Sequence, residues 1–194
     1  MRSALLLLLL LPACRSSSNG PVQRITPAPN AGAPQEHQQI DPKTGQTLHA
    51  WSTVAIGNGL SKKHGKETVL RKDGSKEWER EWDRGQPAGL WRSWYPNGTM
   101  RSEVFFAGPL EERPMTFWFD NGQRRMQGPA RNGVRCGHWQ IWFANGQLAE
   151  EGEFVGSRRE GEWQAWSEDG KTPFVRVYQH DVRLEEREGV VAPK

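Results

Sequence analysis

A strict 24-residue period is the feature that most constrains how this chain can fold. The same class of dipeptide, Asn-Gly or Asp-Gly, recurs five times, and each glycine follows the previous one after 24 residues, as Gly98 follows Gly74. Such equal spacing predicts a repeat architecture in which each unit contacts mainly its neighbours. The five dipeptides are Asp73-Gly74, Asn97-Gly98, Asn121-Gly122, Asn145-Gly146 and Asp169-Gly170.

The chemistry of these dipeptides predicts that each repeat is a β-hairpin. Asn-Gly and Asp-Gly are preferred at the centre of two-residue type I′ turns, whose twist matches that of antiparallel strands. A two-residue turn fixes the pairing of the residues on either side of it. We therefore expect Tyr95 opposite Met100, and Phe143 opposite Leu148.

Alternation along the strand before each turn predicts two different faces. Side chains three, five and seven residues before the glycine lie on the same side of a strand, and at these positions they are mostly apolar. We expect this side to be the packed face of the sheet. Its members are Trp91, Ser93, Tyr95, Met115, Phe117, Phe119, Trp139, Ile141, Phe143, Trp163, Ala165 and Ser167.

A row of tryptophans is expected on the other face. One interpretation is structural: equivalent tryptophans pack on neighbouring repeats and under guanidinium groups, each such pair contributing about 0.5 to 1 kcal/mol. The other is a binding platform for a partner or a sugar chain. The two-residue turn places Arg101 opposite Trp94, and Arg125 opposite Trp118. The candidate platform comprises Trp94, Trp118, Trp142, Trp166, Arg101 and Arg125.

The pattern W-x-x-W-[YF]-x-N-G, found at 91–98 and 139–146, resembles the variant class of MORN repeats. The resemblance extends over about 62–185 and implies an all-β fold, an elongated single antiparallel sheet of five hairpin repeats. The first repeat departs from the pattern at Glu67, which suggests an atypical cap. The class includes bacterial lipoproteins and proteins labelled as YwqK-type antitoxins, which implies an antitoxin or immunity role as one alternative.

The first fourteen residues predict a lipoprotein signal. The apolar run from Ala4 to Leu11 has eight residues, too few at about 1.5 Å each to cross about 30 Å of hydrocarbon. The ending Leu11-Pro12-Ala13-Cys14 resembles a lipobox, which implies cleavage before Cys14 and a diacylglycerol on its sulfur. An ordinary signal peptide with a chance cysteine is the alternative. Arg15 replaces the aspartate that retains lipoproteins at an inner membrane, which implies the outer membrane in a host with two membranes.

Five segments are expected along the chain. Residues 1–13 form the signal peptide, and 14–48 carry the lipidated cysteine and a disordered linker, because Ser, Pro, Asn, Gln and Gly dominate there. Residues 49–61 form a partial repeat or cap. Residues 62–185 hold the five repeats, and 186–194 form a flexible tail.

Composition excludes several classes of function. The formal net charge is +3, from 26 basic and 23 acidic residues, a balance that gives no basic face for nucleic acid. The five histidines have no metal-ligand spacing, and no phosphate loop or dinucleotide motif is present. We expect no metal, no cofactor and no enzyme activity.

Two small clusters carry weaker alternatives. Cys136 lies two residues before His138, which would suit a nucleophilic dyad, and the acidic stretch at 150–153 could imitate a glycosidase pair. If Cys14 is acylated, Cys136 has no disulfide partner in its own chain. It is then expected as a small buried residue, or as one half of an intermolecular bridge.

The sequence thus predicts a membrane-anchored, surface-displayed, non-enzymatic repeat module for protein binding or scaffolding in the cell envelope. The expected partners are the membrane, through the N-terminal lipid, and a protein, for which a toxin is one candidate. Two alternatives stay open. One is an antitoxin or immunity lipoprotein that neutralises a toxin, and the other is a cell-wall carbohydrate-binding module.

Overall fold

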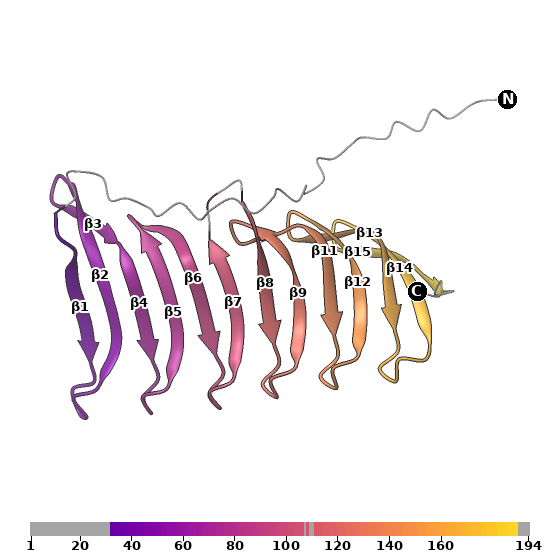
Figure 1. Cartoon of the computed structure of the whole chain (residues 1–194), viewed down its shortest axis with the longest axis horizontal. Coiled ribbons are helices and arrows are strands. Elements are labelled where there is room, and N and C mark those ends of the chain that lie inside the picture. Colours follow the sequence, from indigo (N-terminus) through magenta and orange to yellow (C-terminus); the bar gives the residue numbers. More distant parts are fainter. Residues whose placement is uncertain (1–31, 107, 109–110, 190–194) are drawn as a thin grey trace.

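The computed structural model of the chain describes residues 32–106, 108 and 111–189. This part is one open antiparallel sheet built from consecutive hairpins (Figure 1), so the predicted all-β architecture is confirmed. Within these residues, no helix is long and apolar enough to cross a membrane. The expected signal peptide and the lipidation site Cys14 lie outside them.

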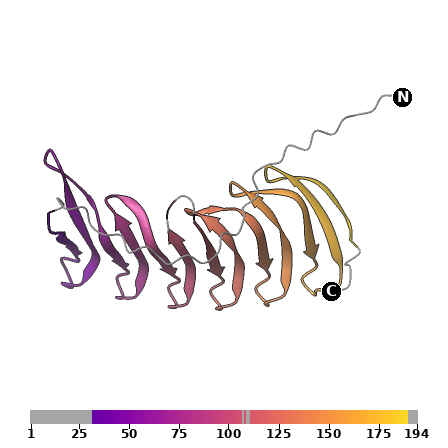
Figure 2. The same ribbon diagram turned by 45° about the horizontal axis from the view of Figure 1, so that its top comes forward.

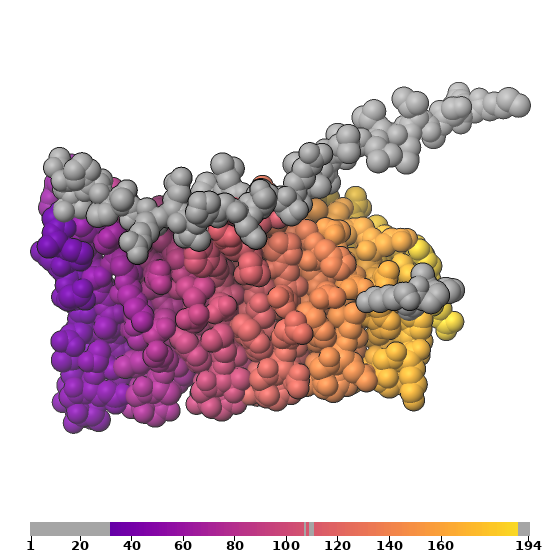
Figure 3. Space-filling view, viewed as in Figure 1, coloured from indigo at the N-terminus to yellow at the C-terminus, as the bar shows by residue number. Residues whose placement is uncertain are grey.

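Strands that follow one another in the chain are neighbours in the sheet. The order is β1-β2-β4-β5-β6-β7-β8-β9-β11-β12-β13-β14-β15, with β3 paired to β2 and β10 paired to β9. The successive repeats form one continuous elongated body (Figure 3). The strands are β1 (Gln35–Ile40), β2 (Thr47–Gly57), β3 (Leu60–Lys63), β4 (Gly65–Leu70), β5 (Lys76–Asp83), β6 (Gln86–Trp94), β7 (Met100–Phe106), β8 (Glu112–Trp118), β9 (Arg124–Arg131), β10 (Val134–Arg135), β11 (Gly137–Trp142), β12 (Leu148–Val155), β13 (Arg158–Trp166), β14 (Pro173–Gln179) and β15 (Val182–Glu188).

The Asn-Gly and Asp-Gly turns lie in a row along the lower edge of the sheet in Figure 1, but they are not type I′ turns. At Asn97-Gly98 only the glycine has a positive φ, of 83°. Its N–H donates to the carbonyl of Tyr95 at 3.0 Å, and the Tyr95 N–H donates to the carbonyl of Thr99 at 2.8 Å. This is a type I turn with a glycine bulge, a three-residue loop. The predicted two-residue turn is wrong.

The extra loop residue changes the pairing next to each turn. Trp94 pairs with Met100, a bulge follows, and Ser93 pairs with Ser102. The expected pairing of Tyr95 with Met100 is therefore wrong, and so is that of Phe143 with Leu148, because Trp142 is the residue that pairs with Leu148. Beyond the bulge the strands return to the register that a two-residue turn would give.

Type I′ geometry occurs instead at the opposite edge of the sheet. There, two residues with positive φ link paired strand ends, as between Asp83 and Gln86. This second series of turns also follows the 24-residue period, and it was not predicted from the sequence. Its members are Arg84-Gly85, Asn132-Gly133, Gly156-Ser157 and His180-Asp181.

The lower turns are linked by an asparagine relay. The Asn97 side chain accepts from the Thr99 N–H at 3.0 Å and donates its amide N–H to the carbonyl of Asp120 in the next turn at 2.7 Å. Asn121 and Asn145 repeat this arrangement, donating to the next turn at 2.8 and 3.1 Å. Each asparagine therefore stabilises its own turn and ties that turn to the following repeat.

The sheet starts earlier than expected. β1 pairs with β2 over six residue pairs, so the linker predicted over 14–48 cannot extend that far. The ring of His37 stacks on Trp51 with centroids 5.4 Å apart, and its Nε2 lies 2.8 Å from the hydroxyl of Thr53. The segment expected as a partial repeat lies within β2 and β3. β1 was missed because it is a polar edge strand without hydrophobic alternation.

The sheet also extends past residue 185 at the other end. β15 continues to Glu188 and pairs with β14 along its length. Ion pairs join this strand to its neighbour, including Arg176 Nε to Glu186 at 2.6 Å. The flexible tail predicted from residue 186 therefore begins too early.

The packed face is built as predicted, from the side chains at odd distances before the turn glycines. Trp139, Trp163 and Ala165 have no exposed surface, and Ser93 is 2% exposed. Rings follow one another edge to face with centroids 5.1 to 6.0 Å apart, from Trp139 to Tyr178. The strands are bent along their length (Figure 2). The buried cluster comprises Met115, Ala130, Trp139, Phe154, Trp163 and Tyr178.

Two glycines make room for the buried indoles. A Cβ on Gly128 would lie 2.4 Å from the Trp139 ring, and one on Gly152 would lie 2.5 Å from Trp163. Neither glycine has a positive φ, so space is what requires glycine here. A single-layer sheet buries these rings by laying them against backbone.

Candidate functional site

The four predicted tryptophans lie on the face opposite the packed face, which we call the outer face. All four are half-buried, so they are neither sealed in the fold nor freely exposed. Each occupies the last position of its strand, next to a lower turn. They are Trp94 in β6, Trp118 in β8, Trp142 in β11 and Trp166 in β13.

The residues paired with these tryptophans complete a mostly apolar band across the strands, which we call the Trp strip. It becomes less charged toward the C-terminal end, where Leu148 and Pro173 replace the cation Arg124. The cross-strand pairs of the strip are Trp94 with Met100, Trp118 with Arg124, Trp142 with Leu148, and Trp166 with Pro173.

Cations cover two of the four indoles. Lys76 Nζ lies 5.6 Å from the ring centroid of Trp94, and the Arg124 guanidinium lies 5.0 Å from that of Trp142. In each case the cation belongs to the preceding repeat. The predicted packing under cations is therefore present, with partners different from those expected.

Arg101 and Arg125 do not occupy the predicted places. Met100 pairs with Trp94, and Arg124 pairs with Trp118, so each predicted arginine lies one residue away, in the bulge. Arg101 lies 5.7 Å from the ring of Tyr95, and Arg125 lies 5.9 Å from that of Phe119. The three-residue turn is the physical reason for the shift.

Ring-to-ring contacts do not connect the tryptophans of the strip among the residues that the structure describes; those recorded lie within the β1–β2 hairpin and on the packed face. Equivalent positions in neighbouring repeats are two strands apart, which is about 9.5 Å for strands spaced about 4.7 to 4.9 Å. The tryptophans of the strip therefore do not stack on one another, and two of them contact the neighbouring repeat through Lys76 and Arg124. The rings of the strip are separate contact points.

A row of mostly uncharged polar side chains runs beside the Trp strip. The pairs Thr116 with Gln127, Gln127 with Gln140, and Glu151 with Gln164 lie in direct cross-strand register. Gln140 connects the first two pairs to the third, because it pairs with Gln127 and its amide donates to Glu151 at 3.1 Å. These amides and hydroxyls place hydrogen-bonding groups next to the apolar band.

A shallow depression of about 320 Å³ adjoins this polar row at Gln127. Two prolines, Pro114 and Pro129, face each other across the strands there, and the carboxylate of Glu112 is engaged by Arg131 at 2.7 Å. The lining residues are Glu112, Arg113, Pro114, Gln127, Gly128 and Pro129.

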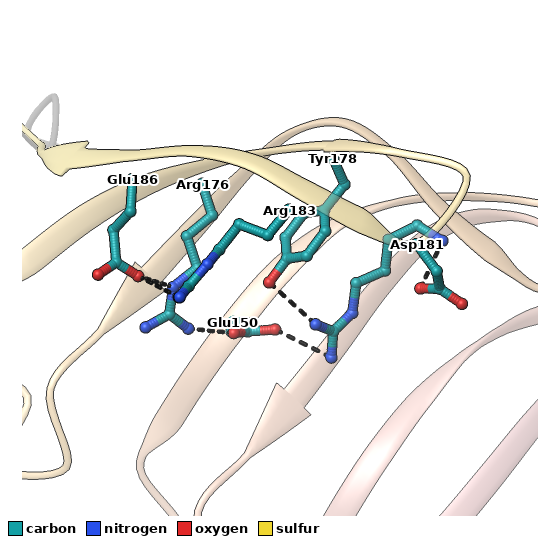
Figure 4. Close-up of polar contacts among 7 residues, drawn as sticks. Glu150, Arg176, Tyr178, Asp181, Arg183 and Glu186 are labelled. Atoms are coloured by element: carbon teal, nitrogen blue, oxygen red, sulfur yellow. Dashed lines mark hydrogen bonds and ion pairs between the residues drawn. The ribbon is translucent and has the colours of Figure 1, made fainter.

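The C-terminal end of the packed face is closed by charged side chains. The Glu150 carboxylate, 9% exposed, lies between Arg176, with which it forms an ion pair, and Arg159 at 3.2 Å. Arg159 also donates to the hydroxyl of Tyr178 at 3.0 Å and lies 5.1 Å from the ring of Trp163. Figure 4 shows the Arg176 guanidinium beside the Glu150 carboxylate. This end of the packed face is thereby covered, and a ligand would have to displace paired charges to reach it here.

Glu186 extends this network onto the edge strand. It accepts from Arg176 at 2.6 Å and from Arg183 at 2.8 Å (Figure 4). The hydrogen bond from Arg176 lowers the pKa of the Glu186 carboxyl below its ordinary value. Burial disfavours the charged form of Arg176, but its bonds to Glu186 and Glu150 outweigh this and raise the pKa of its guanidinium.

A second buried carboxylate lies at the N-terminal end. Glu67 stands where other repeats have the first tryptophan, and it is 2% exposed. It contacts His49 at 2.7 Å, the indole N–H of Trp82 at 2.8 Å, and Lys63. Burial raises the pKa of Glu67, but these hydrogen bonds outweigh burial and leave it below the ordinary value. The sequence analysis identified Glu67 only as a departure from the repeat pattern. A carboxylate at a tryptophan position was the signal that could have predicted this group of hydrogen bonds.

The acidic stretch at 150–153 is divided between the two faces. Glu150 serves the packed-face network, whereas Glu151 bonds to Gln140 on the outer face. Strand alternation separates them, so they do not face a common substrate position. Among the described residues, no group of three or more His, Cys, Asp or Glu side chains could hold a metal ion.

The predicted dyad partners are engaged elsewhere. His138 is largely exposed and lies 3.4 Å from Glu151 and 3.7 Å from Glu153. Cys136 is disulfide-bonded, so its sulfur is not a free nucleophile. The sequence has two cysteines, and the other, Cys14, lies outside the described residues.

Comparison with known proteins supports the repeat assignment at two places. Residues 87–107 and 135–155 match the sequence profile of the MORN repeat variant. The two matches begin two periods apart and cover most of β6 with all of β7, and β11 with β12. MORN repeats are generally protein- or membrane-binding modules and are typically non-catalytic. No curated protein matches the chain significantly. In these two repeats the chain is similar to the MORN repeat variant.

Proposed function

We propose that this chain is a membrane-anchored, non-enzymatic repeat module of the cell envelope that binds a protein partner through the outer face of its array. The observation that carries the proposal is the contrast between the two faces. At the C-terminal end, the packed face is filled by fully buried rings and covered by Arg159, Glu150 and Arg176. The outer face keeps four half-buried tryptophans at regular intervals. Trp is among the residues most enriched at energetically dominant interface positions.

The membrane anchor in this proposal is the lipid on Cys14. Its support is the short apolar run followed by Leu11-Pro12-Ala13-Cys14. The array begins at β1, so residues 15–34 separate it from the anchor. At a maximum of about 3.3 to 3.6 Å per residue, this segment could span roughly 65 Å. A repeat array on such a spacer would stand clear of the lipid headgroups and would be accessible to a partner.

Affinity capture from detergent-solubilised envelopes tests the protein-binding proposal. The bait is the full chain as wild type, as Leu148→Lys in the Trp strip, or as Val182→Lys on β15, where Val182 is 61% exposed. We expect the wild type and Val182→Lys to capture the same protein in near-stoichiometric amount, and Leu148→Lys to lose it. Equal capture by all three baits, or capture by none, would refute the proposal.

A further inference from the structure

The Trp strip crosses the strands, and this direction limits what can bind along it. A partner strand that extended the sheet would lie parallel to β1 or β15 and would pair with an edge backbone. The strip instead runs at right angles, through pairs in β6 to β14. A chain lying along the strip has no backbone ladder to pair with, so its own N–H and C=O groups must be satisfied by side chains or water.

The polyproline II helix is the extended conformation that fits this requirement. It has no internal hydrogen bonds and keeps its backbone solvated, and proline contributes no N–H. Proline-rich segments in this conformation dock on aromatic-lined surfaces in several known recognition modules. The strip offers such a surface, with Leu148 and Met100 between neighbouring indoles and the amides of Gln127 and Gln164 beside it as donors to the partner's carbonyls.

The spacing of the tryptophans in the strip agrees with the length of one turn of a polyproline II helix. Tryptophans of the strip recur every second strand, which is about 9.5 Å. One turn of a polyproline II helix has three residues rising about 3.1 Å each, which is about 9.3 Å. A segment lying across the strands would therefore present the same side to each successive indole. Four tryptophans correspond to about twelve residues of partner.

We infer that the Trp strip binds an extended, proline-rich segment of a partner protein in the polyproline II conformation, with one turn of the ligand on each repeat. This deepens the proposed function and rests on it. The most apolar section, from Leu148 to Trp166 and Pro173, is the strongest part of the site. The section at Arg124 is weaker for this ligand, because the guanidinium already covers the ring of Trp142.

Binding of synthetic peptides to the full chain in detergent solution tests this inference. The probes are an oligoproline of about twelve residues, an alanine peptide of equal length with proline at every third position, and a Gly-Ser peptide of equal length. We expect both proline peptides to bind, and the Gly-Ser peptide to bind at least tenfold more weakly. Peptide dissociation constants come from fluorescence anisotropy.

Three variants locate the site. Leu148→Lys puts a hydrated charge between two indoles and is expected to weaken oligoproline binding at least tenfold, which is about 1.4 kcal/mol. Val182→Lys makes the same chemical change away from the strip and should leave affinity unchanged. Arg124→Leu gives the third repeat the residue of the fourth and should tighten binding. A melting curve of each variant checks the fold, and the Arg124→Leu gain remains decisive if Leu148→Lys unfolds.

Several results would refute binding of a polyproline II segment to the Trp strip. If oligoproline fails to bind, or binds Leu148→Lys as well as wild type, the inference is refuted. If a hexamer of N-acetylglucosamine binds instead, with the same sensitivity to Leu148→Lys, the strip is a glycan surface. Protein capture that depends on Leu148, without peptide binding, would refute this inference and leave the proposed function standing. Loss of both would refute the two together.

Discussion

Trp139 lies flat against the backbone of Gly128, so closely that a single added Cβ would meet its ring at 2.4 Å. One repeat earlier, the equivalent positions hold Val104 and Met115, which pair directly across β7 and β8. The bulk that is gained at one position is lost at the other. The two residues therefore form an exchangeable size pair, and the sheet has used both solutions in neighbouring repeats.

This pairing predicts a double-mutant result. Gly128→Val alone should destabilise the array by overpacking, at about 1 to 3 kcal/mol, and Trp139→Met alone should destabilise it by leaving space. Gly128→Val with Trp139→Met recreates the third-repeat pair and should cost less than the sum of the singles, by about 0.5 to 3 kcal/mol. Urea unfolding measures the three values. Gly32→Ala, where nothing lies within 4 Å, is the control, and strict additivity would contradict the size-pair interpretation.

The two rows of tryptophan should differ in their contribution to stability. Trp163 has no exposed surface, so Trp163→Ala should reduce the free energy of unfolding by about 3 to 5 kcal/mol. Trp118 is half-buried, and Trp118→Ala should cost clearly less, because a smaller area is returned to water. Thermal melts of the two variants compare them. An equal loss would mean that the Trp strip is as structural as the packed face.

The asparagine relay predicts an asymmetric response to Asn–Asp exchange. Asn121→Asp removes the donor to the carbonyl of Ala144 and places a charge beside that oxygen, so it should cost about 0.5 to 1.5 kcal/mol or more. Asp169→Asn, in the last of these turns, is the matched exchange in the opposite direction and should be nearly neutral. Chemical denaturation at neutral pH gives both values. Equal effects of the two exchanges would argue against the relay.

Acid should weaken the N-terminal end through Glu67. Its pKa is lowered in the folded chain, so its charge stabilises the fold above the unfolded-state pKa of about 4.3, and this stability is lost as the pH falls through the folded value. The groups facing it are Lys63, His49, Arg80 and Trp82. Wild type should therefore lose more melting temperature than Glu67→Gln between pH 5 and pH 3 (about one unit either side of that value). Parallel pH curves for the two chains would show that Glu67 does not titrate in this way.

Anchoring is tested at Cys14. Replacing it by Ser should move the protein from the membrane fraction to the soluble fraction, because the lipid attaches to that sulfur. A thioether at Cys14 and a disulfide between Cys14 and Cys136 would compete for the same sulfur atom. Alkylation of the purified wild type followed by intact-mass measurement distinguishes the two states. Membrane retention of Cys14→Ser would refute lipid anchoring through this residue.

The array and its two faces could be predicted from the sequence because each depends on a short-range rule. The spacing of the Asn-Gly and Asp-Gly pairs determines where strands reverse, and alternation assigns Trp139 and Trp163 to the packed face. Both rules act within one repeat. Neither needs knowledge of a distant contact.

The turn type could not be read from the dipeptide alone, because Asn-Gly suits both a type I′ turn and a type I turn followed by a left-handed glycine. Pro96 is the residue that indicates the type I turn, since proline favours the second position of such a turn. The misplaced Arg101 and Arg125 follow from this one error. β1 was missed for a different reason: a polar edge strand is stabilised by backbone pairing and by His37, which leave little trace in a hydrophobic pattern.

The entry of the chain through an edge strand determines how the array responds to mechanical force. A pull on the residues before Gly32 acts first on β1, which is tied to the sheet by one ladder of six residue pairs. Those pairs would separate one after another, because each hydrogen bond contributes only about 0.5 to 1.5 kcal/mol to stability. The Trp strip begins at β6, three strands beyond β2 in the sheet. Tension between the segment before β1 and a bound partner would therefore separate the β1–β2 hairpin while the Trp strip stays folded.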